Sequence, residues 1–431
     1  MVDRINCEVA SMETLGERIR KMRKEKKMTL EELAGERISK SMLSLIENNK
    51  AQPSMESLTF ISEQLGVGVG ELMQQGDKKE IRKLLKQAEV LYHSESEIYV
   101  QDQLVRKFTK VVEHIRPYLN QLEDGYESAR LLQLYSYSLF YSNQDGWQDT
   151  LKHAANIYEK INATSKRASI GIFQATVLFS KNKYSSALQV LLQEKEKIEQ
   201  KEPYIDPLIK LDFDYSEAVY RLAIGDTDVA MQVIENAIQY SKTHKIFYHI
   251  DDLFRIAAGY GLLFHDEEKI SYYTNKLKHY GEFVDDPFYH AFADFIAAER
   301  MIFKEQNFSG ALDRIEKHLN EVSIETLDPH FIIVKGKCLY ELGHYEEAIH
   351  WLNKVNVPYY LHHPYDLSLL YIGDSYKALC HLKLDNLEQA LTFATLAKEN
   401  FEPILDSFYK EFAYRTYRQV VEAIKKEKKI P

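Results

Sequence analysis

Three polar residues near the start of one short segment carry hydrogen-bonding groups and have no catalytic partner beside them. Lys40, Ser41 and Ser44 alternate with the apolar residues Leu43 and Ile46, so a helix here turns the first three outward and buries the other two. A lysine ammonium donates hydrogen bonds to oxygen and nitrogen acceptors, and a serine hydroxyl either donates or accepts. These outward side chains therefore predict a surface that recognises its partner by hydrogen bonds.

A basic segment precedes these residues. Leu15, Ile19 and Met22 recur at the spacing of one helix face, and the outward positions are nearly all basic. The basic residues are Arg18, Arg20, Lys21, Arg23, Lys24, Lys26 and Lys27. A charge run is usually a solvated face, but the neighbouring polar helix favours contact with a polyanion, with Arg20 among the contacting residues.

Local signals define the elements that hold these side chains. Thr29 and Glu32 form a capping box for a second helix, Ser39 can cap a third over 40–50, and Pro53 and Ser54 start a fourth. The glycines of residues 66–70 lack the spacing of a nucleotide-binding loop and indicate a loop between helices. Short helices in about sixty residues, with a tight turn between the second and third, are typical of a helix-turn-helix domain.

The runs LGERIRKMRKEKKMTLEELA, SKSMLSLIENNKAQPS and LGVGVGELM resemble the phage-repressor-like helix-turn-helix family over residues 14–73. The resemblance implies that Lys40, Ser41 and Ser44 face DNA bases. It also implies that Lys50 and Gln52 lie near phosphates, and that Arg23 and Glu47 form a structural ion pair.

A repeated pattern fills the remaining chain. A turn residue, an aromatic or apolar residue and then an alanine recur about every 40 residues, which indicates stacked helix pairs. The repeat positions are Ala187, Ala230, the degenerate Ile270, Ala311, Ala348 and Ala390. The copy IVKGKCLYELGHYEEAIHWL resembles a tetratricopeptide repeat (TPR), with Gly336, Leu339, Gly343, Tyr345 and Ala348 at family positions.

The sequence therefore predicts an all-α protein, with an N-terminal five-helix helix-turn-helix domain followed by a right-handed α-solenoid of TPR-like helix pairs. We assign residues 1–13 to an N-terminal extension and 14–73 to the DNA-binding domain. Residues 74–79 form a linker, and 80–431 form a repeat domain that binds a peptide or a protein.

The first helix of each pair in such a solenoid lines a concave face. Counting back from the repeat alanines places seven polar residues there as candidates for binding a peptide's carboxylates or C-terminus. They are Asp212, Tyr215, Asp252, Arg255, Arg300, His330 and Lys337. The alternative is that each cation is paired with a nearby acid or is solvated.

The charge, the cysteines and the missing catalytic motifs limit the classes of protein to which this chain can belong. The net charge of −10 is carried almost wholly by the repeat region, so only the neutral N-terminal region suits a polyanion. Three scattered cysteines fit a reducing compartment, and no apolar run spans a bilayer, so we expect a cytoplasmic protein away from membranes. No catalytic or nucleotide-binding motif is present, so we expect no enzyme, metal or cofactor.

In architecture the whole chain resembles the RRNPP family of peptide-pheromone receptors, which includes PlcR-like and NprR-like regulators. The resemblance implies a quorum-sensing transcription regulator whose DNA binding is controlled by a short signalling peptide in the repeat groove. It implies a homodimer or higher oligomer on double-stranded DNA. Related Rap proteins bind sporulation response regulators, so an adaptor that inhibits a response regulator stays an alternative, also within the same protein.

Overall fold

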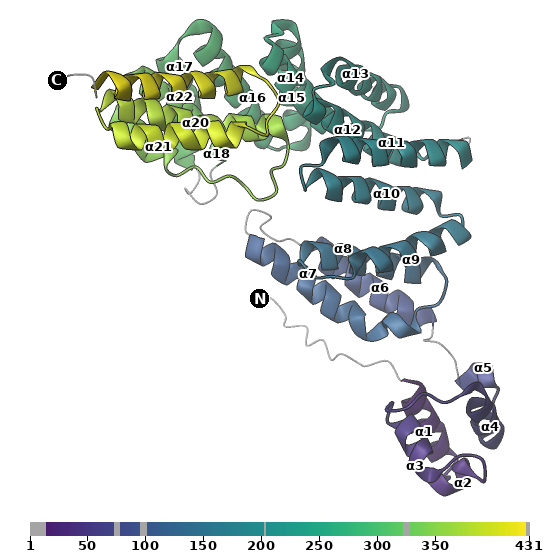
Figure 1. Cartoon of the computed structure of the whole chain (residues 1–431). Helices are drawn as coiled ribbons and strands as arrows, with labels where there is room; N and C mark the ends of the chain where they lie inside the picture. The colour runs from purple at the N-terminus through teal and green to yellow at the C-terminus, as the bar shows by residue number, and fades with distance from the viewer. Residues whose placement is uncertain (1–13, 73–77, 95–100, 202–203, 322–327, 428–431) are drawn as a thin grey trace. The chain divides into compact units, whose positions relative to one another are not determined.

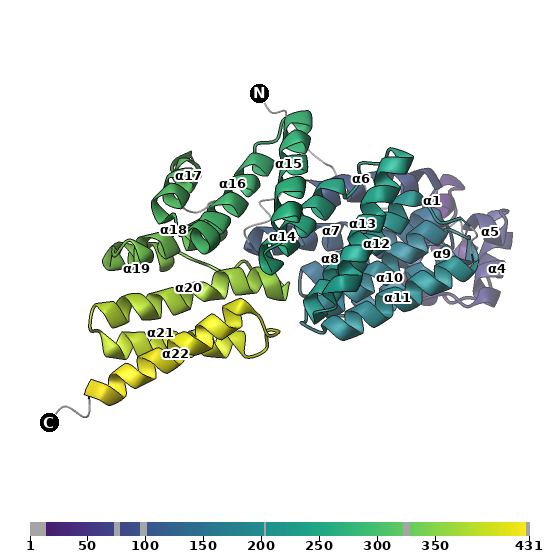
Figure 2. The ribbon, with the colours of Figure 1, turned by 90° about the horizontal axis from the view of Figure 1, so that it is seen from above.

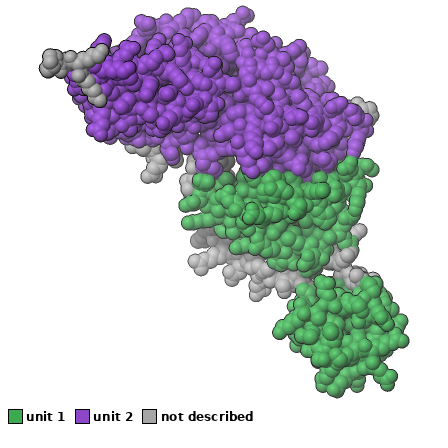
Figure 3. Space-filling view, viewed as in Figure 1, with its two compact units in different colours: residues 1–163 green, residues 164–431 purple. Residues whose placement is uncertain are grey.

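The computed structural model describes residues 14–72, 78–94, 101–201, 204–321 and 328–427. Within these ranges all regular structure is helical (Figure 1), which confirms the predicted all-α class. The chain divides into two compact units, residues 1–163 and 164–431 (Figure 3). The expected N-terminal extension, residues 1–13, and residues 74–77 of the expected linker lie outside the described ranges.

Five short helices form the start of the first unit, as expected. They are α1 (Leu15–Glu25), α2 (Leu30–Ala34), α3 (Lys40–Glu47), α4 (Met55–Leu65) and α5 (Val69–Leu72). Their apolar faces enclose one core in which Ile19, Leu33, Leu43 and Ile61 are fully buried. A domain of this size depends on such a core because it buries little surface in total.

The rest of the first unit is a second helical group with its own core. It contains α6 (Lys78–His93), α7 (Gln101–Ile115), the 3-10 helix η1 (Arg116–Gln121), α8 (Tyr126–Tyr141) and α9 (Trp147–Lys160). Helices α6, α7 and α8 pack on one another, and α8 pairs with α9. Because α6 begins at Lys78, the last two residues of the expected linker 74–79 are helical.

The second unit is a succession of helix pairs. The first three pairs are α10 (Thr164–Phe179) with α11 (Tyr184–Lys201), α12 (Pro207–Ile224) with α13 (Thr227–His244), and α14 (Ile250–Phe264) with α15 (Glu267–Val284). The next elements are α16 (Phe288–Arg300), the π-helical turn η2 (Met301–Glu305) and α17 (Phe308–Glu321). The last are α18 (Pro329–Glu341), α19 (Tyr345–Leu352), α20 (Pro364–Lys383), α21 (Leu387–Phe401) and α22 (Phe408–Glu427).

The repeated turn has one backbone conformation in all six copies of the pattern. The residue five positions before each repeat position has a positive φ, and the repeat residue is the fourth residue of the second helix of its pair. The turn residues are Asn182 (59°), Gly225 (84°), His265 (57°), Gln306 (49°), Gly343 (85°) and Asp385 (53°). The five repeat alanines are fully buried, and Ile270 is 6% exposed.

Small residues let the paired helices approach closely. A Cβ atom added to Gly336 of α18 would lie 2.3 Å from Leu352 Cδ2 of α19, far inside van der Waals contact. Since Leu352 is itself fully buried, it has no space to move into. The glycine identified from its repeat position is therefore a packing residue.

The first helices of successive pairs also pack on one another, in the order α10, α12, α14, α16, α18 and α20, and the last helix, α22, packs on α20. Figure 2 shows these helices and their partners following one another along the second unit. This double set of contacts is the arrangement of an α-solenoid and confirms the predicted repeat architecture.

One contact joins distant repeats of the second unit. Residues 353–363, between α19 and α20, are called the closing segment below. The Tyr184 hydroxyl, at the start of α11, donates to the carbonyl oxygen of His362 at 2.8 Å, across 178 residues. The His363 ring lies 6.2 Å from the ring of Phe179 at the end of α10. The closing segment leads into α20 and therefore fastens the sixth pair of this unit, α20 with α21, to the first, α10 with α11.

Candidate functional site

Capped helix ends hold the turn between α2 and α3. Thr29 and Glu32 form the predicted capping box, with the Glu32 amide donating to Thr29 Oγ1 at 3.2 Å and the Thr29 amide donating to Glu32 Oε2 at 2.6 Å. Ser39 caps α3, since its hydroxyl accepts from the Met42 amide at 3.1 Å. Gly35 ends α2 with φ at 53°, where a Cβ atom would meet the Phe60 ring at 2.8 Å. The turn is therefore fixed by local hydrogen bonds and one glycine.

The predicted ion pair of the helix-turn-helix domain is present. Arg23 Nε and Nη2 donate to the two carboxylate oxygens of Glu47 at 2.6 and 2.8 Å, and Nη1 donates to the Met28 carbonyl at 2.8 Å. The Arg23 and Glu47 side chains are only 11% and 4% exposed. The hydrogen bonds to Glu47 raise the pKa of Arg23. This pair fixes α3 against α1 and is unavailable for contacts outside the domain.

The three residues expected to face bases occupy the outer side of α3. Lys40 and Ser41 are exposed, and Ser44 is partly exposed. Lys40 Nζ lies 2.8 Å from Glu31 Oε1, but these two side chains are 59% and 72% exposed. Such an exposed pair contributes about 0–1 kcal/mol, so Lys40 can exchange this partner for another acceptor at small cost.

Helix α3 ends earlier than the sequence predicted. We expected the helix to reach Lys50, but it ends at Glu47 because Asn49 adopts a left-handed φ of 56°. The Asn49 side chain accepts from the Gly16 amide at 3.3 Å and donates to Thr14 Oγ1 at 2.6 Å. Lys50 and Gln52 follow this anchor and are exposed, as is Arg20 on α1.

A second polar cluster lies in the second unit, called the repeat unit below, on α12, on α14 and at the residue that precedes α14. We call Asp212, Tyr215, His249, Asp252 and Arg255 the His249 network. His249 Nε2 lies 3.0 Å from Asp212 Oδ1, and His249 Nδ1 lies 2.8 Å from Asp252 Oδ2. The His249 ring is stacked on Tyr215 at 4.5 Å, and Arg255 is ion-paired with Asp252. Four of the seven residues predicted by counting back from the repeat alanines therefore meet here: Asp212, Tyr215, Asp252 and Arg255.

Histidine 249 is charged at neutral pH in this setting. Burial lowers the pKa of His249, but the hydrogen bonds and charges of Asp212 and Asp252 outweigh it and raise the pKa to about 9. Both ring nitrogens then donate to carboxylates. The repeat pattern did not point to this residue because it precedes α14 with a left-handed φ of 58°, outside the helical spacing that located its neighbours.

The other three predicted peptide contacts bind different partners. Arg300 Nε lies 2.6 Å from Glu267 Oε2, and His330 Nδ1 lies 2.7 Å from Asp328 Oδ1. Lys337 Nζ donates to both carboxylate oxygens of Glu299, at 2.7 and 3.0 Å, and Lys337 is only 3% exposed. Like Arg255, each of these three side chains is paired with an acid, which is the alternative that the sequence left open.

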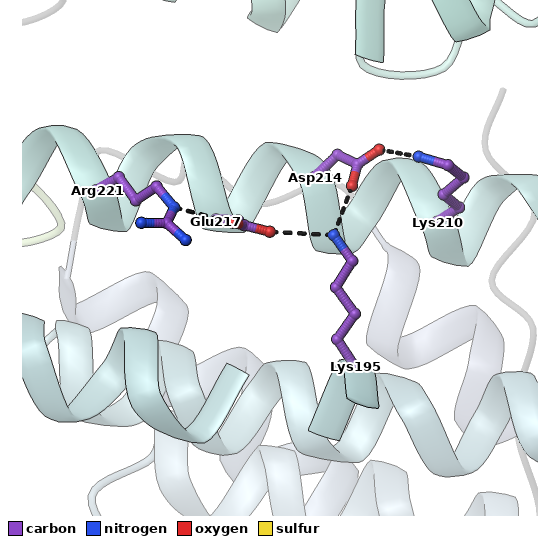
Figure 4. A network of polar contacts seen from close by, with 5 residues as sticks. All are labelled: Lys195, Lys210, Asp214, Glu217 and Arg221. Carbon is purple, nitrogen blue, oxygen red and sulfur yellow. Dashed lines mark hydrogen bonds and ion pairs between the residues drawn. The ribbon is translucent and has the colours of Figure 1, made fainter. Parts of the chain in front are cut away.

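A third network is structural. On α12, Asp214 is 4% exposed and Glu217 is 6% exposed, and Lys195 of α11 lies between them at 2.9 and 3.0 Å (Figure 4). Lys210 pairs with Asp214, and Arg221 Nε lies 2.9 Å from Glu217 Oε1. Burial lowers the pKa of Lys195, but the two carboxylates outweigh it and raise the pKa. Each buried carboxylate is thus paired, and the network fixes α11 to α12.

The described residues contain no group of three or more histidine, cysteine, aspartate or glutamate side chains arranged to hold a metal ion. None of the described helices combines the length and the apolar character that crossing a membrane requires.

Comparison with protein families identifies the first domain. Residues 16–78 match the family described as a helix-turn-helix domain, which confirms the predicted N-terminal architecture. A search of curated proteins by sequence found no match.

Several solved structures are similar to the chain. PlcR of Bacillus thuringiensis, in complex with the peptide PapR7 and DNA, has 15% sequence identity and a TM-score of 0.35, over 66% of this chain and 99% of PlcR. ComR from S. thermophilus, in complex with DNA and its signalling peptide ComS, has 16% identity and a TM-score of 0.30, over 67% of this chain and 99% of ComR. The TPR domain of P58(IPK) has 12% identity and a TM-score of 0.32, over 89% of this chain and 87% of that domain.

Proposed function

We propose that the protein is a transcription regulator that binds operator DNA through α3. The observation that carries this proposal is the outer side of α3, where Lys40, Ser41 and Ser44 extend from a helix fixed by the Arg23–Glu47 pair. A helix held in this way fits the major groove with its N-terminal half towards the base edges.

Each residue of this surface has a distinct role in the proposal. Lys40 donates to guanine, and Ser41 and Ser44 hydrogen-bond to neighbouring bases. Lys50, Gln52 and Arg20 contact phosphates, which set the register of the protein and add no sequence preference. Two copies of the chain place their α3 helices about 34 Å apart, or a multiple of this distance, on one face of the duplex.

DNA binding is tested by selecting duplexes from a random pool with the full chain and measuring affinity for the selected sequence by fluorescence anisotropy. Lys40→Ala should weaken specific binding roughly tenfold, within the 1–3 kcal/mol that a good base contact contributes. Lys160→Ala is the matched control, because Lys160 is 65% exposed and pairs with Asp124 at 2.7 Å, much as Lys40 pairs with Glu31. Equal affinities of the two variants would contradict the role of Lys40.

Two further measurements test the domain as a whole. Removal of residues 1–73 should abolish specific binding and leave a folded helical protein. The logarithm of the affinity of the intact chain should fall with the logarithm of salt concentration by about 0.9 per neutralised phosphate. Specific binding by the truncated chain would contradict the proposal.

We also propose that the repeat unit binds a short signalling peptide at the His249 network and thereby controls DNA binding, as in quorum sensing. Arg255 supports this location, because its side chain is 33% exposed and its guanidinium lies 5.5 Å from the centre of the Phe288 ring. A peptide carboxylate would pair with the exposed part of this guanidinium. Peptides are the ligands to test because PlcR and ComR were each solved with one.

The peptide proposal is tested by screening a pool of short synthetic peptides against the full chain by native mass spectrometry, with and without the selected duplex. Arg255→Gln should abolish retention of the peptide, whereas Arg300→Gln should not, because Arg300 pairs elsewhere, with Glu267 and Glu305. A peptide regulates only if it has different affinities for the DNA-bound and free states, so peptide and duplex should each change the other's affinity by the same factor. The same masses give the oligomeric state.

A further inference from the structure

Two apolar side chains stand on the outer side of α3. Met42 is 46% exposed and Leu45 is 41% exposed, whereas Leu43 and Ile46 of the same helix are at most 2% exposed. Met42 and Leu45 are three positions apart, so they are neighbours on the helix surface. The sequence pattern explained the buried pair and gave no role to the exposed pair.

The surroundings of this pair indicate what covers it. Ser41 and Ser44 lie on the same outer side of α3, and Lys40 is at its first position. The neighbouring helix α1 exposes the cations Arg20 and Lys24, which complement a polyanion. An apolar contact within such a polar and basic surface fits the major groove, where thymine presents a C5 methyl group among hydrogen-bonding atoms.

We propose that Met42 and Leu45 contact thymine C5 methyl groups and thereby determine part of the sequence specificity of α3. This inference rests on the proposed DNA-binding function. Thymine is the base that offers an apolar group at the major-groove edge, so an aliphatic side chain placed there favours A·T pairs at its position. Specificity then comes from two kinds of contact: hydrogen bonds from Lys40 and the serines, and burial of methyl groups.

The experiment removes the methyl group from the DNA and the side chain from the protein. In the duplex selected by the full chain, each thymine is replaced in turn by deoxyuridine, which differs only by the missing C5 methyl group. Affinities are measured for the wild type, Met42→Ala and Leu45→Ala. Leu396→Ala is the control, because Leu396 is a leucine of α21 with nearly the same exposure, 40%, outside the helix-turn-helix domain.

The expected result is coupling between one thymine and one side chain. Deoxyuridine at that thymine should weaken wild-type binding about fourfold, the effect of burying one methyl group. The same replacement should have no effect on the alanine variant of the residue in contact, and its full effect on Leu396→Ala. Melting curves should show equal stability of all variants, since neither α3 side chain belongs to the core.

A second variant changes specificity instead of removing it. Leu45→Gln has a side chain that can pair with adenine N6 and N7, so a new selection should replace a preferred thymine by adenine at one position. An unchanged preference would overturn the assignment of Leu45.

The remaining outcomes separate this inference from the function on which it rests. Tight binding of a selected duplex with no deoxyuridine effect at any thymine would overturn the inference and leave DNA binding in place. If Leu45→Ala changes the oligomeric state of the protein without DNA, Met42 and Leu45 form a contact between copies of the chain. That result would also overturn the inference. Selection of no duplex at all would overturn both.

Discussion

Replacing Glu47 by glutamine is expected to lower the stability of the helix-turn-helix domain, so that its open state is populated more often, while the repeats stay folded. The Glu47 carboxylate accepts from Arg23 at 2.6 and 2.8 Å, and both side chains are nearly buried. A neutral amide has one acceptor oxygen in place of two. The variant therefore leaves the charge of Arg23 buried without an opposite charge.

The size of the effect follows from this burial. Removing one partner of a buried ion pair costs about 3–5 kcal/mol. The low end applies here, because Arg23 keeps its hydrogen bond to the Met28 carbonyl at 2.8 Å. A loss of about 3 kcal/mol raises the population of the open domain roughly 150-fold.

Amide hydrogen exchange of the full chain measures this population on peptides from α1 and α3. Glu31→Gln is the control, since Glu31 accepts from Lys40 at a similar distance, 2.8 Å, but at an exposed site. Its effect should stay below about 1 kcal/mol. Exchange that is unchanged in Glu47→Gln, or raised equally in both variants, would refute the argument that burial decides the effect. Replacing Arg23 and Glu47 together by apolar residues should restore most of the protection.

Three further predictions concern the helical repeats. In a denaturant titration, Gly336→Ala should lower the unfolding free energy by about 1–3 kcal/mol, because the added methyl group would overlap α19. Gly125→Ala is the control and should lower the unfolding free energy far less, because no atom lies near its added methyl group. The pKa of His249 is about 9 in the folded protein and about 6.5 in the unfolded chain, so protonation of His249 stabilises the fold by up to about 3 kcal/mol. This stabilisation is complete below pH 6.5 and is lost as the pH rises through 9, and His249→Asn should lack this part of the pH dependence of the unfolding free energy. Identical dependence in the wild type and the variant would contradict the prediction. Tyr184→Phe removes the hydrogen bond to His362 and should cost about 0.5–1.5 kcal/mol, with faster hydrogen exchange in the closing segment and unchanged exchange in the helix-turn-helix domain.

Features specified by neighbours in the sequence were predicted well. The Thr29 capping box is local, and the repeated turns are set by residues that tolerate a positive φ, such as Asn182 and Gly225. The buried repeat alanines follow the turns at a fixed distance. The spacing of these alanines along the chain is therefore enough to locate the second helix of each pair.

Features that depend on a neighbouring helix were predicted less well. The spacing along α14 predicted that Asp252 and Arg255 face the same groove, and these two side chains are ion-paired, but nothing local showed that His249 would join them. The spacing also could not show that Lys337 is enclosed with Glu299, because that pairing depends on how α16 meets α18. The exposed Leu45 went unnoticed since a leucine in a helix is normally assigned to the core.

The closing segment changes how the repeat unit is expected to unfold. In an array whose pairs touch only their neighbours, unfolding starts at an end and spreads one repeat at a time. Here the hydrogen bond from Tyr184 to His362 spans 178 residues, so fraying of the first pair also releases contacts of the sixth. The unit gains cooperativity from this link between its ends. The same link is a contact of high sequence separation, which slows folding because the chain must close a long loop before the contact forms.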